Sequence, residues 1–526
     1  MRKIFLALFC SLTILSANVW AEWEKYEYFD NSGGLNDAFS PIAISDNEAA
    51  DLQNVVFTTS GNWKTRDGMD AITDTTVTNS TSSSGPTVAC TGLKYYRPTS
   101  GTRFIIGIFS NDTIKKMDYN SLGPDSTWDD ITGQISFDVG QDDLASFTVG
   151  EDILIIEDGL NTTAPYKWTG SGNVAALGGS PPNAKIVAYH KRMAFAAGNN
   201  SNPSTLYFSD VGNIENWTTG LSGNLSIETN DGSVIRAITP GFDALYIFKD
   251  KSIWRLTGND KDTFELQRMV SDLGVISPNA VGFIANEFIF AATNGNYYIY
   301  DGSIGIKLIS TKIEGTIENL NTNRIGFISS VIFDDDYYAL VSQIGVANHN
   351  RILVYDTFRQ AWSKFVGIEA NAIAVVDNGL GEDVLLFGGY NGKVYQYPSG
   401  LTDDGGVITT TYLTKQYRFP SQDKRTLKDF RLLKVFTNQK GNYNLTVEIR
   451  EDFESTGSSN TINLLGTTSV YGTAVYGVDR YGGQNLITGI IEVNKDAANF
   501  FQINFNATQP VEVKGWQVWI ERDDTL

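Results

Sequence analysis

A recurring pair of short apolar segments, separated by a tight polar turn, is the feature that most restricts the fold of this chain. The pair is clearest in Leu245–Leu256, where two such segments flank Asp250, and in Ala292–Gly302, where an Asn-Gly pair separates them. The segments are rich in β-branched and aromatic residues, which favour extended strands, and Asn-Gly favours the positive φ angles of a two-residue hairpin turn. The pattern therefore predicts antiparallel β-hairpins.

These hairpins recur at a nearly constant interval along the chain. An aromatic residue closes the returning strand of each copy, in the order Tyr119, Trp168, Phe208, Trp254, Tyr300, Tyr355 and Tyr397. The interval averages about 46 residues, which is typical of the four-stranded blades of a β-propeller. The alternative is an antiparallel sandwich, but sandwiches turn every ~8–12 residues without a longer period. We predict six or seven blades, the number depending on whether the N-terminal hairpin completes the last one.

The rest of the chain divides into segments of different character, and the expected fold class is all-β: a β-propeller followed by a C-terminal β-sandwich. Two of the aromatic residues that close a repeat, Trp254 and Tyr300, are expected to be buried between neighbouring blades. The expected organisation is a signal-peptide-like segment at 1–21, an N-terminal hairpin with a short helix at 22–72, a Ser/Thr-rich loop at 73–86, the propeller at 87–405 and the sandwich at 406–526.

The N-terminal segments carry two specific predictions. Residues 1–21 combine a basic start, an apolar run and a small residue at Ala21, which is the pattern of an export signal. Its removal would leave Cys90 as the only cysteine, so no intrachain disulfide is expected. Residues 45–55 are predicted to form the short helix, with Ser45 or Asp46 as its cap and with Leu52 and Val55 facing the core. No later segment has the length and apolar composition of a membrane span.

The charge balance restricts the partners of the protein. The chain has 40 basic and 60 acidic side chains, a formal net charge of −20. Such a surface repels phosphate groups, which argues against a protein that grips nucleic acid. High solubility alone explains the charge equally well.

A set of residues near the N-terminus resembles a known family. The set is Gly34-Leu35-Asn36, Pro41, Ile44, Asp46-Asn47-Glu48-Ala49, Asp51-Leu52, Asn54-Val55, Phe57, Gly61 and Arg66-Asp67-Gly68. It resembles the N-terminal signature of the β-propeller virion proteins of tailed bacteriophages, which form the tail tube or nozzle or stabilise packaged DNA. Weaker motifs follow in the family's order as far as Gly392–Gln396 and Asp403-Asp404-Gly405.

The resemblance implies a structural subunit of a short-tailed phage tail, located in the virion. Its expected partners are identical subunits in a ring, by resemblance a hexamer, together with the portal or adaptor and other tail proteins. Double-stranded DNA is expected to be retained by the ring and to pass through it during ejection without specific binding, for which an acidic wall is suited.

Two other functions remain open. One is an exported bacterial propeller that binds carbohydrate or protein and lies in the periplasm, on the cell surface or outside the cell. The other is a secreted propeller that cleaves glycosides, because a catalytic carboxylate pair need not be close in sequence.

The sequence offers no candidate catalytic, cofactor-binding or metal-binding residues, and the protein is predicted not to be an enzyme. His190 and His349 are the only histidines, and neither has a partner at metal-ligand spacing. Asp334-Asp335-Asp336 is interpreted as a hairpin turn rather than a calcium site, since it lacks the spacing of an EF-hand loop. The small basic cluster Lys424, Arg425 and Lys428 is the candidate contact with an acidic neighbouring subunit; a solvated turn is the alternative.

Overall fold

The computed structural model describes residues 23–522 apart from 74–75, 79–87, 121–122, 125–126, 136–138, 228–229, 231, 304, 379, 419–427, 439 and 466–485. The segment expected to be an export signal, 1–21, lies outside the described residues, and so does most of the loop expected over 73–86.

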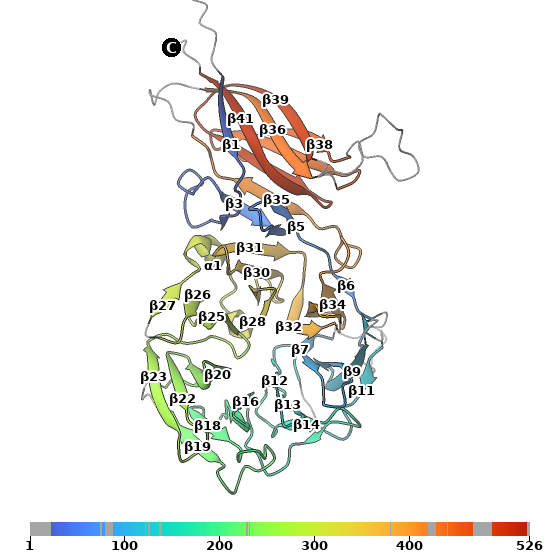
Figure 1. Cartoon of the computed structure of the whole chain (residues 1–526), viewed down its shortest axis with the longest axis vertical. Helices are drawn as coiled ribbons and strands as arrows, with labels where there is room; N and C mark the ends of the chain where they lie inside the picture. Colours follow the sequence, from blue (N-terminus) through green and yellow to red (C-terminus); the bar gives the residue numbers. More distant parts are fainter. Residues whose placement is uncertain are drawn as a thin grey trace, which may run out of the picture.

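Small antiparallel sheets arranged around a common axis form the larger part of the described chain, as a propeller (Figure 1). The first strands of neighbouring blades pack against one another around the axis. Blade 1 consists of β7 (Cys90–Tyr96), β8 (Phe104–Phe109), β9 (Thr113–Asn120), β10 (Gly123–Pro124) and β11 (Asp129–Asp130). Blade 2 consists of β12 (Ser146–Gly150), β13 (Ile153–Glu157), β14 (Tyr166–Trp168) and β15 (Ala175–Ala176). Blade 3 consists of β16 (Ile186–His190), β17 (Met193–Ala197), β18 (Thr205–Phe208) and β19 (Gly223–Ser226).

The remaining blades follow the same order from the axis outward. Blade 4 consists of β20 (Ile235–Gly241), β21 (Ala244–Lys249), β22 (Ser252–Thr257) and β23 (Glu265–Ser271). Blade 5 consists of β24 (Val281–Ile284), β25 (Glu287–Ala291), β26 (Tyr297–Tyr300) and β27 (Ile306–Leu308). Blade 6 consists of β28 (Ser329–Phe333), β29 (Asp336–Val341), β30 (Arg351–Asp356) and β31 (Ala361–Val366). Blade 7 consists of β32 (Ala370–Asp377), β33 (Asp383–Gly389), β34 (Val394–Tyr397) and β6 (Asp70–Ala71).

The N-terminal segment closes the ring. Its short strand β6 pairs antiparallel with β34, with Ala71 opposite Tyr395, and so supplies the outer strand of the last blade. The described residues therefore form seven blades, which confirms the propeller and settles the number left open by the sequence. The seam between the last and first blades is tight, since a side chain on Gly388 would meet the Cys90 sulfur at 2.6 Å.

The repeat read from the sequence matches the blades strand for strand. Each of the seven aromatic residues lies on the third strand of a different blade. Tyr300 is fully buried, as predicted. Trp254 also packs against the apolar cluster between blades 3 and 4, but it is only half-buried, so the prediction of full burial is wrong for this residue; the Arg268 guanidinium lies over its ring.

Strands from both ends of the chain build the sandwich. One sheet contains β1 (Trp23–Tyr28), β4 (Val55–Phe57), β5 (Trp63–Thr65), β36 (Lys428–Asn438), β39 (Leu486–Ala498) and β41 (Glu512–Arg522). The other contains β2 (Gly34–Leu35), β3 (Glu48–Gln53), β35 (Thr410–Thr414), β37 (Asn444–Glu451), β38 (Ser458–Asn463) and β40 (Phe501–Ala507). The N-terminal segment, which we expected to stand apart, is thus shared between the sandwich and blade 7.

The helix predicted over 45–55 is wrong, because this segment forms the strand β3. It pairs antiparallel with β35 and parallel with β2, and a bulge interrupts the register between Ala49 and Asp51. The bulge turns both Ala49 and Leu52 toward the core, so two buried residues three positions apart imitate the period of a helix. Pairing on both sides overrides the helical propensity of Glu, Ala and Leu.

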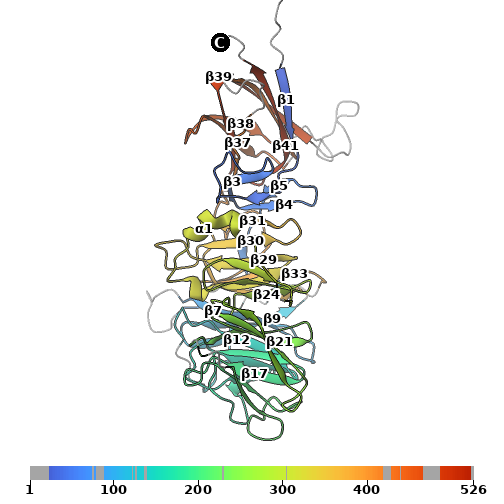
Figure 2. The ribbon, with the colours of Figure 1, turned by 90° about the vertical axis from the view of Figure 1, so that its left-hand side faces the viewer.

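The sandwich sits on the rim of the propeller next to blade 6, and in both views it lies beyond the ring of blades (Figures 1 and 2). Strand β31 contacts β2, β3 and β4 of the sandwich. One apolar core continues across the boundary, from Phe288 and Trp362 in the propeller to Trp63 and Tyr412 in the sandwich. A short helical segment lies beside this boundary: η1 (Thr311–Ile313) and α1 (Glu314–Glu318), followed by η2 (Ile325–Phe327).

Candidate functional site

The joint between the sandwich and the propeller contains a buried ion pair between residues far apart in the sequence. The side chain of Arg66 has no exposed surface, and its Nη1 and Nη2 atoms lie 2.8 and 2.5 Å from the two carboxylate oxygens of Asp403. The same guanidinium donates to the main-chain oxygens of Asp67 and Val366, at 3.0 and 3.3 Å. A bidentate, desolvated pair of this kind fixes both position and orientation.

Asn54 connects this ion pair to three segments of the chain. Its Oδ1 accepts a hydrogen bond from Arg66 Nε at 2.8 Å and another from the Val366 amide at 2.9 Å. Its Nδ2 donates to the oxygen of Thr409 at 2.8 Å. Asn54 has a φ of +56°, a conformation that asparagine tolerates better than most residues. It ties the sandwich strands to β31 and to the segment that leads from blade 7 back to the sandwich.

The two segments that connect the sandwich with the propeller lie against each other, and at Gly68 there is no space for a side chain between them. Gly68 approaches Thr402 so closely that a Cβ atom would meet its main-chain oxygen at 2.2 Å. Met69 forms a parallel bridge with Asp403, and the Met69 amide donates to the Thr402 oxygen at 3.0 Å. The motifs Arg66-Asp67-Gly68 and Asp403-Asp404-Gly405, noted separately in the sequence, therefore meet in one place.

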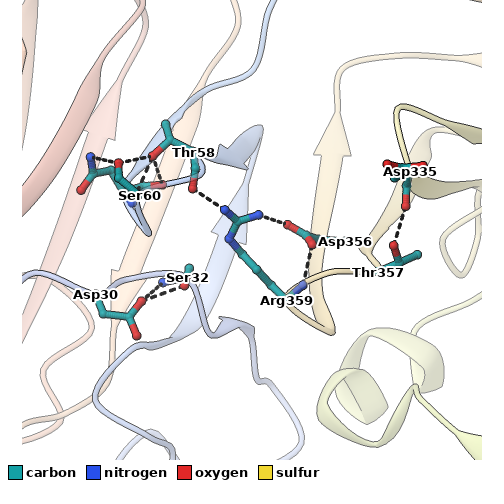
Figure 3. Close-up of polar contacts among 9 residues, drawn as sticks. Asp30, Ser32, Thr58, Ser60, Asp335, Asp356, Thr357 and Arg359 are labelled. Atoms are coloured by element: carbon teal, nitrogen blue, oxygen red, sulfur yellow. Dashed lines mark hydrogen bonds and ion pairs between the residues drawn. The ribbon is translucent and has the colours of Figure 1, made fainter.

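A second polar contact reaches the joint from the turn between β30 and β31 (Figure 3). Arg359 Nη1 pairs with Asp356 at 2.7 Å, and Arg359 Nη2 donates to the Thr58 oxygen in the N-terminal hairpin at 2.5 Å. The same turn is fixed to the neighbouring hairpin, since Thr357 Oγ1 donates to the Asp335 oxygen at 2.7 Å. The turn is thus rigidly placed between blade 6 and the sandwich.

A groove lies beside this turn. It has a volume of about 410 Å³ and is lined by β27, η1 and the β30–β31 turn. Phe358 stands on its edge with 86% of its surface exposed, next to the partly exposed Leu308. The basic groups Lys307, Lys312 and Arg359 also line it. An exposed aromatic residue held on a rigid turn, beside basic groups, is typical of a contact surface for another protein. We refer to it as the Phe358 groove.

The acidic run beside this turn is a hairpin turn, as the sequence indicated. Asp334 and Asp335 have φ values of 49° and 63° and connect β28 to β29. Asp336 lies directly opposite Asp356 on the neighbouring strand. Burial, with the charges of Asp356 and Asp334, raises the pKa of Asp336 to about 8. Among the described residues, no group of acidic, histidine or cysteine side chains has the arrangement of a metal site.

The histidines differ in their surroundings. His349 is buried, and its main-chain amide donates to the Tyr390 hydroxyl at 3.1 Å. The same hydroxyl lies 3.2 Å from the Nδ1 atom of the His349 ring. Burial and the charge of Arg324 lower the pKa of His349 to about 3, so its ring is neutral at physiological pH. Burial also lowers the pKa of the half-buried His190. Cys90 is a buried free thiol, and burial raises its pKa to about 12, which makes it unreactive.

The basic cluster proposed as a subunit contact is only partly described. Lys424 and Arg425 lie outside the described residues. Lys428 is the first residue of β36, where its backbone pairs with Ala498 and Arg522. Among the described residues, no helix has the length and apolar character needed to cross a membrane.

Comparison with known proteins finds similar solved structures but no matching family. No protein-family model matches the chain, and no curated protein matches it. It is similar to the solved structure of YCF48 bound to D1 peptide (11% identity, TM-score 0.40, 66% of this chain and 98% of that chain) and to BamB from Moraxella catarrhalis (12%, 0.33, 72% and 97%). It is also similar to the computationally designed protein Ika8 (12%, 0.37, 60% and 97%). YCF48 and BamB are β-propellers, and at these identities the likeness concerns the fold alone.

Proposed function

We propose that this protein is an assembly subunit, and specifically a structural component of a short-tailed phage tail that forms a ring, retains packaged DNA and lets it pass during ejection. The solved structures similar to the chain do not point to a tail protein. The proposal rests on the residues that carry the family resemblance and on where they lie.

The observation that carries the proposal is that the resembling residues form one structural unit. Gly34-Leu35 is β2, and residues 48–53 form β3. Asn54, Arg66 and Asp403 form the polar centre of the joint. A signature that specifies a joint, rather than a catalytic centre, suits a protein whose sandwich and propeller must keep a fixed angle within an assembly.

The Phe358 groove supplies a surface for such assembly. It lies at the joint, so a neighbour bound there would contact a part of the molecule held rigid by both domains. Its basic groups complement a chain of net charge −20, because the rest of an identical neighbour is predominantly acidic. In the proposed ring, DNA passes through an opening between subunits and not through a propeller. The propeller cavity has a volume of about 230 Å³, which is too small for a duplex whose major groove alone is ~12 Å wide.

The second candidate function is an exported propeller that binds carbohydrate or protein. The feature favouring it is the export-type pattern of residues 1–21, because tail proteins are assembled in the cytoplasm. The two candidates differ in self-association and in ligand, so a pair of measurements separates them.

Sedimentation velocity of the full chain, between roughly one and fifty micromolar, tests self-association. We expect a closed oligomer, which Phe358→Ser weakens by at least tenfold in the association constant. Ile344→Ser is the matched control, since Ile344 is 68% exposed and does not line the groove. A chain that is monomeric throughout this range and binds a glycan on an array would instead establish the exported propeller.

A further inference from the structure

A cavity lies on the axis of the propeller, where the first strands of all seven blades meet. Its volume is about 230 Å³, and residues on or beside β7, β12, β16, β20, β24, β28 and β32 line it. Each of these strands is the edge of its sheet, so part of its backbone N–H and C=O groups lacks a neighbouring strand. A second cavity of about 310 Å³ adjoins it and shares Leu93, Lys94 and Ile373. We call the two together the axial channel.

Lys94 is the only charged residue among the described residues that line the axial channel. It belongs to β7, and within the described part of the chain its ammonium group has neither an ion pair nor a hydrogen bond. Burial lowers the pKa of Lys94, because the charged form has lost water without gaining a partner. In a protein with 60 acidic side chains, a sheltered lysine without a carboxylate partner is conspicuous.

Two of the serine side chains around the channel are already engaged with the protein. Ser146 Oγ accepts a hydrogen bond from the Val187 amide at 3.2 Å, and Ser330 Oγ donates to the oxygen of Asn279 at 2.9 Å. Leu93, Phe147 and Ile186 supply apolar wall. The channel therefore offers one unpaired positive charge, free backbone groups and an apolar surface.

We propose that the axial channel binds a small carboxylate, with the Lys94 ammonium pairing the carboxylate group and the apolar wall holding a short aliphatic chain. The carboxylate of such a ligand would pair with the Lys94 ammonium group, which has no partner among the described protein groups. Charge-assisted hydrogen bonds of this kind are among the stronger polar contacts. The first cavity has room for about eight waters at roughly 30 Å³ each, which corresponds to an acid of about six to eight heavy atoms.

The site is independent of the proposed assembly. The sandwich lies beyond the rim of the ring in both views and therefore leaves the faces of the propeller uncovered (Figures 1 and 2). The carboxylate has two possible sources, a free aliphatic acid and the C-terminal end of a peptide, and the experiment below distinguishes them.

Isothermal titration of the full chain with hexanoate tests the proposal, with hexanol as the uncharged analogue. We expect saturable, one-to-one binding of hexanoate and at least tenfold weaker binding of hexanol. Lys94→Met should weaken hexanoate binding at least tenfold and leave hexanol binding unchanged. A tripeptide with a free C-terminus, compared with its C-terminal amide, shows whether the channel accepts a peptide end as well as a free acid.

The matched control is Lys251→Met, because Lys251 is exposed on the turn between β21 and β22, outside the channel. Lys94→Met removes an unpaired, sheltered charge, so we expect its melting temperature to equal or exceed that of the wild type. Three results would overturn the proposal: no saturable hexanoate binding up to about 20 mM, equal affinity in the folded Lys94→Met variant, or inorganic phosphate binding as tightly as hexanoate.

Discussion

Replacing Arg66 by methionine should destabilise the joint between sandwich and propeller, at the point where β6 completes blade 7. Among the described residues, the change removes the only cationic partner of Asp403, whose side chain is 90% buried, while keeping an apolar side chain of similar length. Loss of the guanidinium also removes its hydrogen bonds to the main-chain oxygens of Asp67 and Val366 and to the side-chain oxygen of Asn54. Removing one partner of a buried ion pair costs about 3–5 kcal/mol, because the other charge stays buried and unpaired.

That free energy should appear locally, as opening of the segment that completes blade 7. β6 contributes only two residues to its sheet, and the bridge from Met69 to Asp403 lies directly beside the ion pair. Hydrogen exchange measured by mass spectrometry should show amides in 66–72 and 399–406 exchanging ~10²–10³ times faster, since each 1.4 kcal/mol corresponds to about tenfold. Peptides from blades 2 to 4 should keep wild-type rates.

Two controls make the result specific to the buried pair. Arg192→Met removes an arginine that pairs with Glu151 at 3.3 Å but is 67% exposed, and it should cost at most about 1 kcal/mol. The double variant Arg66→Met, Asp403→Leu removes both charges and should regain much of the loss. Wild-type exchange in 66–72 for Arg66→Met, or additive losses in the double variant, would refute the role assigned to the pair.

Three further predictions concern other parts of the fold. Burial, with the charge of Asp158, raises the pKa of Glu157 well above its usual value, so the carboxyl destabilises the fold increasingly as pH rises above about 4.5; Glu157→Gln should raise the melting temperature at pH 8 and leave it unchanged near pH 4. Tyr300→Ala should cost about 3–5 kcal/mol in chemical denaturation, whereas Trp254→Ala, at a half-buried position, should cost roughly half as much or less; equal losses would contradict the burial difference. Reversing Lys424, Arg425 and Lys428 to Glu should weaken self-association in sedimentation, more strongly at low salt, and no salt dependence would remove these residues as an electrostatic contact.

The propeller was predictable because its blades depend on local patterns. Hairpin turns and the aromatic residue on each third strand recur at a fixed interval, so the period is visible without knowledge of tertiary contacts. The seventh blade was not fixed by the same pattern, because its outer strand is the dipeptide Asp70-Ala71, which comes from more than 300 positions earlier in the chain. A two-residue strand has no sequence period to detect.

The joint was less predictable, for two physical reasons. The bulge in β3 places Ala49 and Leu52 on one face at a spacing of three, so a strand imitates a helix. Arg66 and Asp403 lie 337 positions apart, and nothing in either Asp-Gly motif shows that they pair. The only sequence indication of this ion pair is the presence of these two charged residues, one in each of two motifs that otherwise resemble turns. The axial lysine, Lys94, carries no signal in the sequence, since its isolation depends on seven strands meeting around it.

Electron microscopy of the purified full chain at concentrations that populate the oligomer tests the assembly proposal most directly. We predict ring-shaped class averages with a central opening wider than a DNA duplex, and the same joint angle between propeller and sandwich in every subunit. By the family resemblance, the ring should have six-fold symmetry. Class averages that show only single propellers with one sandwich each, at every concentration, would rule out the proposed ring.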